Sequence, residues 1–185
     1  AQSFTTRVVS AQPRDMATIE VDSQGRLIVG SRAGEIFEVD PFAGFSTSVV
    51  YLDGGNVIGS LRGLTVDGQD RIYILEGPQG SVAGGRMYRL DGGTPNVVAV
   101  TAKGVRGAID PLTGELWVSQ EGGPVDGAGE ILRIDVNQTP MRAGHWRRDP
   151  FTTLDVGAAD AGMAFDADGN VYVAAGDTGR VMRID

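Results

Sequence analysis

Charged and amide side chains recur beside the short apolar segments of this chain, at a spacing that could assemble a binding site. One set stands just before the first apolar segment of each repeat: Asp15, Arg62, Arg106 and Asp160. A second set ends the next apolar segment: Ser31, Glu76 and Gln120. A mixed-charge mouth of this kind could bind a small polar ligand or a cation. The alternative is that arginines and aspartates neutralise one another there and hold water.

A second candidate surface lies in the insertion 136–150. It groups one tryptophan with basic and imidazole side chains: Trp146, Arg142, His145, Arg147 and Arg148. Trp and Arg are enriched at interface hot spots, and the patch has the opposite charge to an otherwise acidic chain. It therefore favours a protein partner or self-association. The alternative is that Trp146 covers a sheet edge as a plug.

The segment Asp166-Ala-Asp-Gly-Asn170 has part of the composition of a calcium loop. It lacks the downstream bidentate glutamate of such a loop, and Asp and Gly are common turn residues. We therefore predict a hairpin turn here and no cofactor, with Ca²⁺ as the less favoured alternative.

The elements that would position these residues repeat four times. The clearest marker is a segment that begins with Gly and ends with Asp, at 34–40, 85–91, 129–135 and 179–185. A β-rich run precedes each marker, and an earlier run ends in an aspartate: Asp22, Asp67, Asp110 and Asp166. These aspartates lie 45, 43 and 56 residues apart, a spacing typical of β-propeller blades.

We therefore predict an all-β, four-bladed β-propeller with four-stranded antiparallel blades, as one domain over 1–185. The blades are expected at about 16–52, 61–102, 105–156 and 160–185. The last has no room for its own fourth strand, so the N-terminal strand 3–10 is expected to complete it and close the ring. In the alternative, that strand comes from a neighbouring molecule and gives a swapped dimer or a filament.

Two long Gly- and Pro-containing loops, 75–85 and 119–129, replace the short loop 30–34 of the first blade. They fall at the same end of the predicted ring as the mouth residues and would form a rim on one face. Loops on a rigid scaffold are where binding residues concentrate.

The last repeat, Gly-x-x-x-Asp-x-x-Gly-Asn-Val-Tyr-Val, resembles the NHL-type propeller repeat. The chain is similar to the superfamily of NHL proteins, the SMP-30/gluconolactonase group and streptogramin lyases, a resemblance that implies fold rather than one activity. The SMP-30 group uses an acid-and-amide set at the channel mouth, and only Glu76 and Gln120 match it. Ser31 and Ala175 cannot complete such a cation shell. Streptogramin lyases use a histidine base, but His145 falls in the insertion.

Composition excludes several function classes. A net charge of −8 without a basic run makes nucleic acid and anionic membranes poor partners. The absence of cysteine excludes disulfides and thiolate metal sites, and no apolar run is long enough for membrane insertion. Ala1-Gln2 directly before a strand is typical of a mature N-terminus after signal cleavage, so we expect an exported bacterial protein.

These observations predict a non-enzymatic, exported binding or assembly module. It would bind a protein or a small polar ligand through the loops on one propeller face. The alternative is a small hydrolase or lyase of the SMP-30/streptogramin-lyase kind, with a divalent cation at the channel mouth.

Overall fold

The computed structural model describes residues 15–52, 58–77, 85–101, 104–120, 130–136, 162–175 and 179–184, and the regular elements in these ranges are β-strands. The first sheet is formed by β1 (Met16–Val21), β2 (Leu27–Ser31), β3 (Ile36–Asp40) and β4 (Ser46–Tyr51). The second is formed by β5 (Leu61–Val66), β6 (Ile72–Glu76), β7 (Gly85–Asp91) and β8 (Thr94–Thr101). The third contains β9 (Gly104–Ile109), β10 (Leu116–Gln120) and β11 (Glu130–Ile134), and the fourth contains β12 (Gly162–Phe165), β13 (Val171–Ala175) and β14 (Arg180–Ile184).

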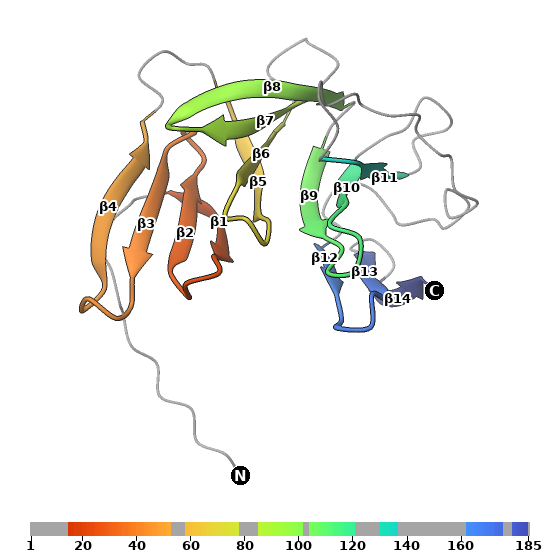
Figure 1. Ribbon diagram of the computed structural model, residues 1–185. Coiled ribbons are helices and arrows are strands. Elements are labelled where there is room, and N and C mark those ends of the chain that lie inside the picture. Colours follow the sequence, from red (N-terminus) through yellow and green to blue (C-terminus); the bar gives the residue numbers. More distant parts are fainter. Residues whose placement is uncertain are drawn as a thin grey trace.

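The four antiparallel sheets follow one another in chain order, as the repeat predicts (Figure 1). The first strand of each sheet lies innermost: β1 contacts β5, β5 contacts β9, and β9 contacts β12. The predicted strand 3–10 and the expected outer strand of the third blade, 151–156, lie outside the described residues. Closure of the ring by the N-terminal strand therefore stays a prediction. Over the ranges given above, no helix is long and apolar enough to cross a membrane.

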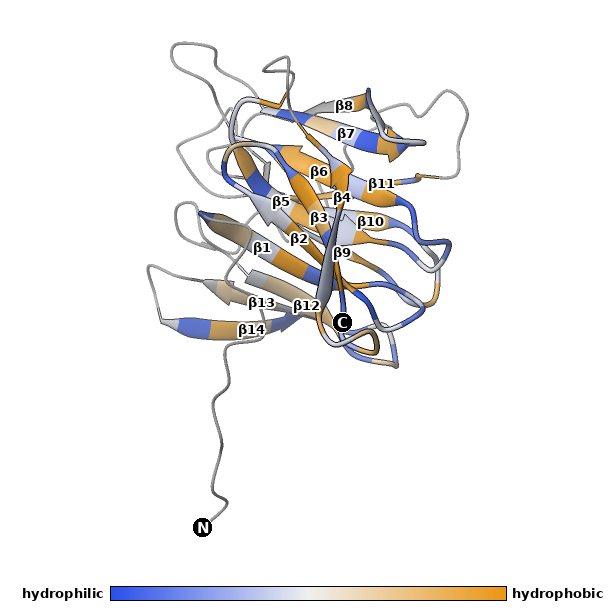
Figure 2. Ribbon diagram, turned by 90° about the vertical axis from the view of Figure 1, so that its left-hand side faces the viewer, coloured by the Kyte–Doolittle hydropathy of each residue, from blue (hydrophilic) through white to orange (hydrophobic). Residues whose placement is uncertain are grey.

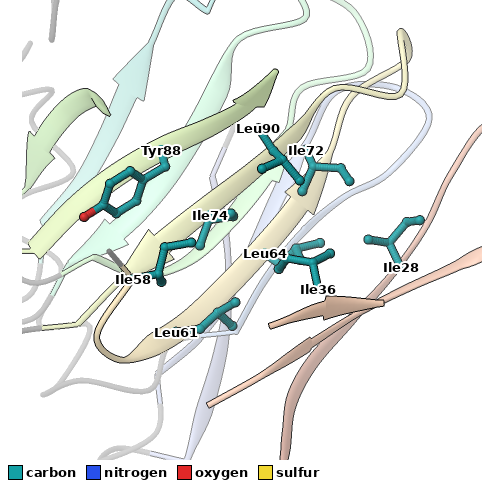
Figure 3. Close-up of a cluster of buried hydrophobic side chains, with 9 residues drawn as sticks. All are labelled: Ile28, Ile36, Ile58, Leu61, Leu64, Ile72, Ile74, Tyr88 and Leu90. Atoms are coloured by element: carbon teal, nitrogen blue, oxygen red, sulfur yellow. The ribbon is translucent and has the colours of Figure 1, made fainter. Parts of the chain in front are cut away.

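Hydrophobic residues fill the spaces between neighbouring sheets. In the largest cluster, Ile28 and Ile36 of the first sheet meet Leu64, Ile72 and Ile74 of the second (Figure 3). These five side chains are at most 8% exposed. Figure 2 shows hydrophobic residues concentrated on the strands and hydrophilic residues on the turns that join them. The sheets are therefore held together mainly by buried apolar surface.

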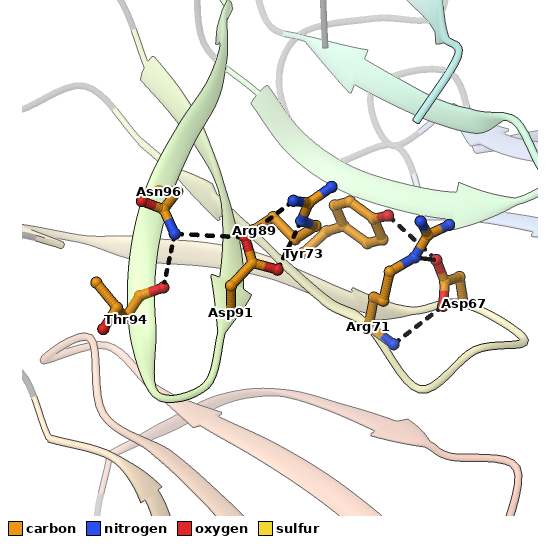
Figure 4. A network of polar contacts seen from close by, with 7 residues as sticks. All are labelled: Asp67, Arg71, Tyr73, Arg89, Asp91, Thr94 and Asn96. Carbon is orange, nitrogen blue, oxygen red and sulfur yellow. Dashed lines mark hydrogen bonds and ion pairs between the residues drawn. The ribbon is translucent and has the colours of Figure 1, made fainter. Parts of the chain in front are cut away.

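Each hairpin between the first two strands of a sheet is anchored by the aspartate that ends the first strand. Asp67 accepts hydrogen bonds from the backbone N–H groups of Gln69 and Arg71, at 2.9 and 3.0 Å, and Figure 4 shows the one from Arg71. Its other oxygen binds the Arg71 guanidinium at 2.5 Å and the Tyr73 hydroxyl at 3.1 Å. Burial, reinforced by the Asp67 charge, raises the pKa of Tyr73.

The last hairpin repeats this arrangement. Both carboxylate oxygens of Asp166 accept hydrogen bonds from the Asn170 side chain, and one also accepts from the Tyr172 hydroxyl. The Asn170 side chain is the main reason why the pKa of Asp166 lies below its ordinary value. The segment 166–170 is thus a hairpin turn, as predicted.

Polar and close-packed contacts also join adjacent sheets. The backbone N–H and the hydroxyl of Ser23, in the first hairpin, both donate to Asp70 in the second, at 2.8 and 2.7 Å. At Gly30 a Cβ atom would lie 2.9 Å from a Leu61 methyl carbon, so the absence of a side chain lets β2 approach β5. The first and second sheets are therefore joined both at their hairpin turns and along β2 and β5.

Candidate functional site

A cavity of about 450 Å³ lies where the innermost strands begin. Three sheets or their loops supply its walls: Met16, Ala17, Arg32, Ser60, Leu61, Arg62 and Arg106. Arg62 and Arg106 were both predicted from their positions ahead of the first strands, and the structure brings them to the same cavity. Its volume falls within the range of small-molecule sites.

Two arginines are fixed at this mouth by backbone groups. The Arg106 guanidinium donates a hydrogen bond to the carbonyl oxygen of Arg62. The stem of Arg62 crosses Gly77, where a Cβ atom would lie only 2.6 Å from Arg62 Cγ. Among the described residues, no acidic side chain forms an ion pair with Arg62 or Arg106. Guanidinium N–H groups at this position are suitable donors for an anionic ligand.

Asp15 lies beside Arg32 at the edge of the same mouth. The Asp15 carboxylate is 3.8 Å from the Arg32 guanidinium, and both side chains are about 70% exposed. An ion pair at this distance and exposure is weak. The carboxylate therefore offsets only part of the positive charge contributed by the three arginines.

Glu76 and Ser31, also expected at the mouth, serve the fold. Glu76 is 6% exposed, and its carboxylate accepts hydrogen bonds from the Gly59 N–H at 2.9 Å and the Tyr88 hydroxyl at 3.1 Å. Ser31 is fully buried and exchanges hydrogen bonds with Glu35 in a turn. Neither residue lines the cavity. Within the described ranges, no three His, Cys, Asp or Glu side chains gather closely enough to hold a metal ion.

Several predicted site residues are placed only in part. Gln120 ends β10 and pairs with Gly104 of β9 and Glu130 of β11. Asp160, the rim segments 78–84 and 121–129, and the whole proposed patch lie outside the described residues; that patch is Arg142, His145, Trp146, Arg147 and Arg148.

The opposite end of the innermost strands holds a second cavity, which the sequence analysis missed. It has a volume of about 450 Å³ and is lined by the ends of β1, β5, β9 and β12, including Glu20, Thr65, Ile109, Met163 and Phe165. Burial raises the pKa of Glu20 to about 7. The two cavities thus differ in charge: three arginines line the first, whereas Glu20 and Asp166 lie among apolar residues in the second.

Comparison with known proteins supports the fold. No protein-family model and no curated protein match the chain. A gluconolactonase from Xanthomonas campestris is similar in structure, with a TM-score of 0.66 and 20% identity over 91% of this chain and 61% of that one. An auxiliary nutrient binding protein from Bacteroides thetaiotaomicron has a TM-score of 0.65 and 14% identity over 92% of this chain and 38% of that one. The extracellular domain of BT4673 from the same organism has a TM-score of 0.52 and 12% identity, over 92% and 24% of the two chains.

These similarities confirm the predicted resemblance to SMP-30-like and NHL-like β-propellers at the level of fold. The chain spans about three fifths of the gluconolactonase. The similar structures include both an enzyme and a binding protein, so the fold alone does not select an activity.

Proposed function

We propose that this protein is a non-enzymatic binding module that takes a small carboxylate-bearing ligand at the mouth formed by Arg32, Arg62 and Arg106. The observation that carries the proposal is that three arginine residues line one cavity of small-molecule size. Arginine presents N–H donors in a planar fork that matches a carboxylate. Hydroxyl groups of the ligand would find the Ser60 side chain on the same wall.

The cation-dependent hydrolase or lyase is the weaker reading. Glu76, the carboxylate of the expected acid-and-amide set, already accepts hydrogen bonds from the Gly59 N–H and the Tyr88 hydroxyl. A cation would also have to approach a mouth that carries three arginines.

We further propose that the module works outside the cytoplasm and contacts a protein partner. Export gains support from the similarity to the extracellular domain of BT4673. Partner binding rests on the patch around Trp146, and the predicted completion of the fourth sheet by strand 3–10 belongs to the same proposal.

Isothermal titration calorimetry with a matched pair of sugars tests whether the ligand must carry a carboxylate. D-glucuronate and D-glucose differ mainly in the carboxylate, so glucuronate is expected to release heat on binding and glucose is not. Raising the salt concentration should weaken binding because the site is exposed and charged. Equal binding of both sugars, or binding of neither glucuronate nor the simpler carboxylates citrate and acetate, would contradict the proposal.

A further inference from the structure

The packed interfaces between neighbouring sheets use the same positions of each second strand. Its second and fourth residues point to the sheet that follows, whereas its first and third residues point to the sheet that precedes. The three apolar clusters follow this rule: Ile28 with Ile72 and Ile74, then Tyr73 and Leu75 with Leu116 and Val118, then Trp117 with Val171 and Val173. We call the side of a sheet that points to the next sheet its following face, and the opposite side its preceding face. Each interface therefore joins the following face of one sheet to the preceding face of the next.

The first sheet presents a preceding face that no described sheet covers. On this face four residues lie in register across β1 to β4: Ile19, Val29, Phe37 and Val49. Beside them, Val21 of β1 pairs with Leu27 of β2. Ile19, Val21 and Val49 are 57, 58 and 55% exposed. We call this surface the leading face; it comprises the exposed Ile19, Val21 and Val49, the half-buried Leu27 and Phe37, and Val29, which is 3% exposed between its neighbours on the sheet.

The fourth sheet presents a following face that is likewise uncovered by the described sheets. Tyr172 and Ala174 occupy the second and fourth positions of β13, and Arg183 and Val181 lie opposite them on β14. Val181 is 72% exposed. We call this surface the trailing face, and it comprises Ala164, Tyr172, Ala174, Val181 and Arg183.

The trailing face resembles the face of the third sheet that packs against the fourth sheet. At the third interface, Arg133 lies 5.0 Å from the centre of the Trp117 ring, and the ring packs edge-on against Phe165 of the fourth sheet. Trp117 and Arg133 are directly opposed on β10 and β11, as Tyr172 and Arg183 are on β13 and β14. The fourth sheet thus carries the same pairing of an aromatic residue with an arginine on its trailing face.

The leading face resembles the face of the fourth sheet that packs against Trp117 in the third interface. Leu27 and Val29 occupy the strand positions that Val171 and Val173 occupy in the fourth sheet, where those residues are buried against Trp117. The trailing face and the leading face therefore match the two sides of an interface that already forms within the chain. The two faces differ from each other, so neither is expected to pair with a copy of itself.

We propose that the trailing face of one copy packs against the leading face of a second copy, so that two copies of four sheets close one ring of eight. Eight blades lie within the usual range for propellers. An interface between unlike faces is heterologous, and in this case two such contacts close the assembly. Ile19 and Val181 are 57 and 72% exposed, so in the described part of the chain the two faces do not cover each other. The eight-sheet ring is thus the alternative to a four-sheet ring closed within one chain.

Light scattering after size exclusion tests the assembly. The chain has a mass of 19.4 kDa, and the expected particle has twice that mass. Ile19→Lys on the leading face and Val181→Lys on the trailing face should each give a folded monomer, because either change alters both contacts of the ring. Val97→Lys is the matched control, since Val97 is 55% exposed but lies on β8 of the second sheet.

Mixing the variants separates this geometry from other dimers. A mixture of Ile19→Lys and Val181→Lys retains one pair of unaltered faces, so the dimer should partly return. Circular dichroism confirms that each variant is folded. A wild-type chain that stays monomeric at high concentration, or a dimer that neither face variant weakens, would overturn the proposal.

Discussion

The guanidinium of Arg106, on β9, donates a hydrogen bond to the backbone carbonyl oxygen of Arg62, on β5. One basic side chain is thus held by the backbone that carries the other. Because the contact joins two sheets, the separation of the two charges depends on the packing of β5 against β9. The mouth is therefore set by the scaffold before a ligand arrives, which lowers the entropic cost of binding.

Gly77 is expected to control ligand affinity without touching the ligand. An alanine Cβ at this position would lie 2.6 Å from Arg62 Cγ, so Gly77→Ala should displace the Arg62 side chain. We expect the affinity for glucuronate to fall about tenfold, equivalent to the loss of one charge-assisted hydrogen bond. Gly68→Ala is the control because no atom lies within 4 Å of its Cβ position. Equal affinities of the two variants would contradict the assigned role of Arg62.

Asp67→Ala should destabilise the second hairpin. The substitution removes the acceptor for two backbone N–H groups, the Arg71 guanidinium and the buried Tyr73 hydroxyl. We expect the free energy of unfolding in urea to fall by about 2 to 3 kcal/mol. Asp40→Ala loses two backbone contacts at an exposed turn and should cost less than about 1 kcal/mol. A smaller effect at Asp67 than at Asp40 would refute the anchoring role.

Glu20 should make the protein less stable as the pH rises from about 4.5 to about 7. Its pKa is raised by burial, so the folded state holds this proton more tightly than the unfolded state, and the contribution to stability fades as the proton leaves. Glu20→Gln removes that contribution. Relative to the wild type, the variant should therefore gain about 1 to 2 kcal/mol on going from pH 4 to pH 8, after allowance for partial solvation. Parallel stability curves for the two proteins would contradict the raised pKa.

Deleting residues 1–10 should leave the edge of the fourth sheet without its predicted partner strand. An exposed β14 edge favours aggregation, and the loss of pairing should lower the melting temperature. Thermal melts and light scattering of the truncated chain check this. Unchanged melting and an unchanged particle mass would show that strand 3–10 does not complete a sheet.

Repeat spacing was sufficient to predict antiparallel sheets and their order along the chain. The ligand-binding roles of Arg62 and Arg106 stay a prediction. Glu76 was assigned to the mouth because it ends a strand, but its partners Gly59 and Tyr88 are distant in sequence and no local pattern reveals them. Arg32 was passed over as a residue of a short loop. Glu20 lies between Ile19 and Val21, and this alternation of polar and apolar residues is typical of a side chain that faces solvent. Its cavity becomes visible only when β1, β5, β9 and β12 are packed together.

The central claim is that arginines at the mouth bind a carboxylate, and the most direct test is the heat of glucuronate binding to Arg106→Gln. This variant keeps a polar amide on a shorter side chain but loses the charge, so binding should fall at least tenfold while the melting temperature stays close to that of the wild type. Arg180→Gln is the control, since Arg180 is exposed on β14 and does not line the cavity. Undiminished glucuronate binding by Arg106→Gln would contradict the claim.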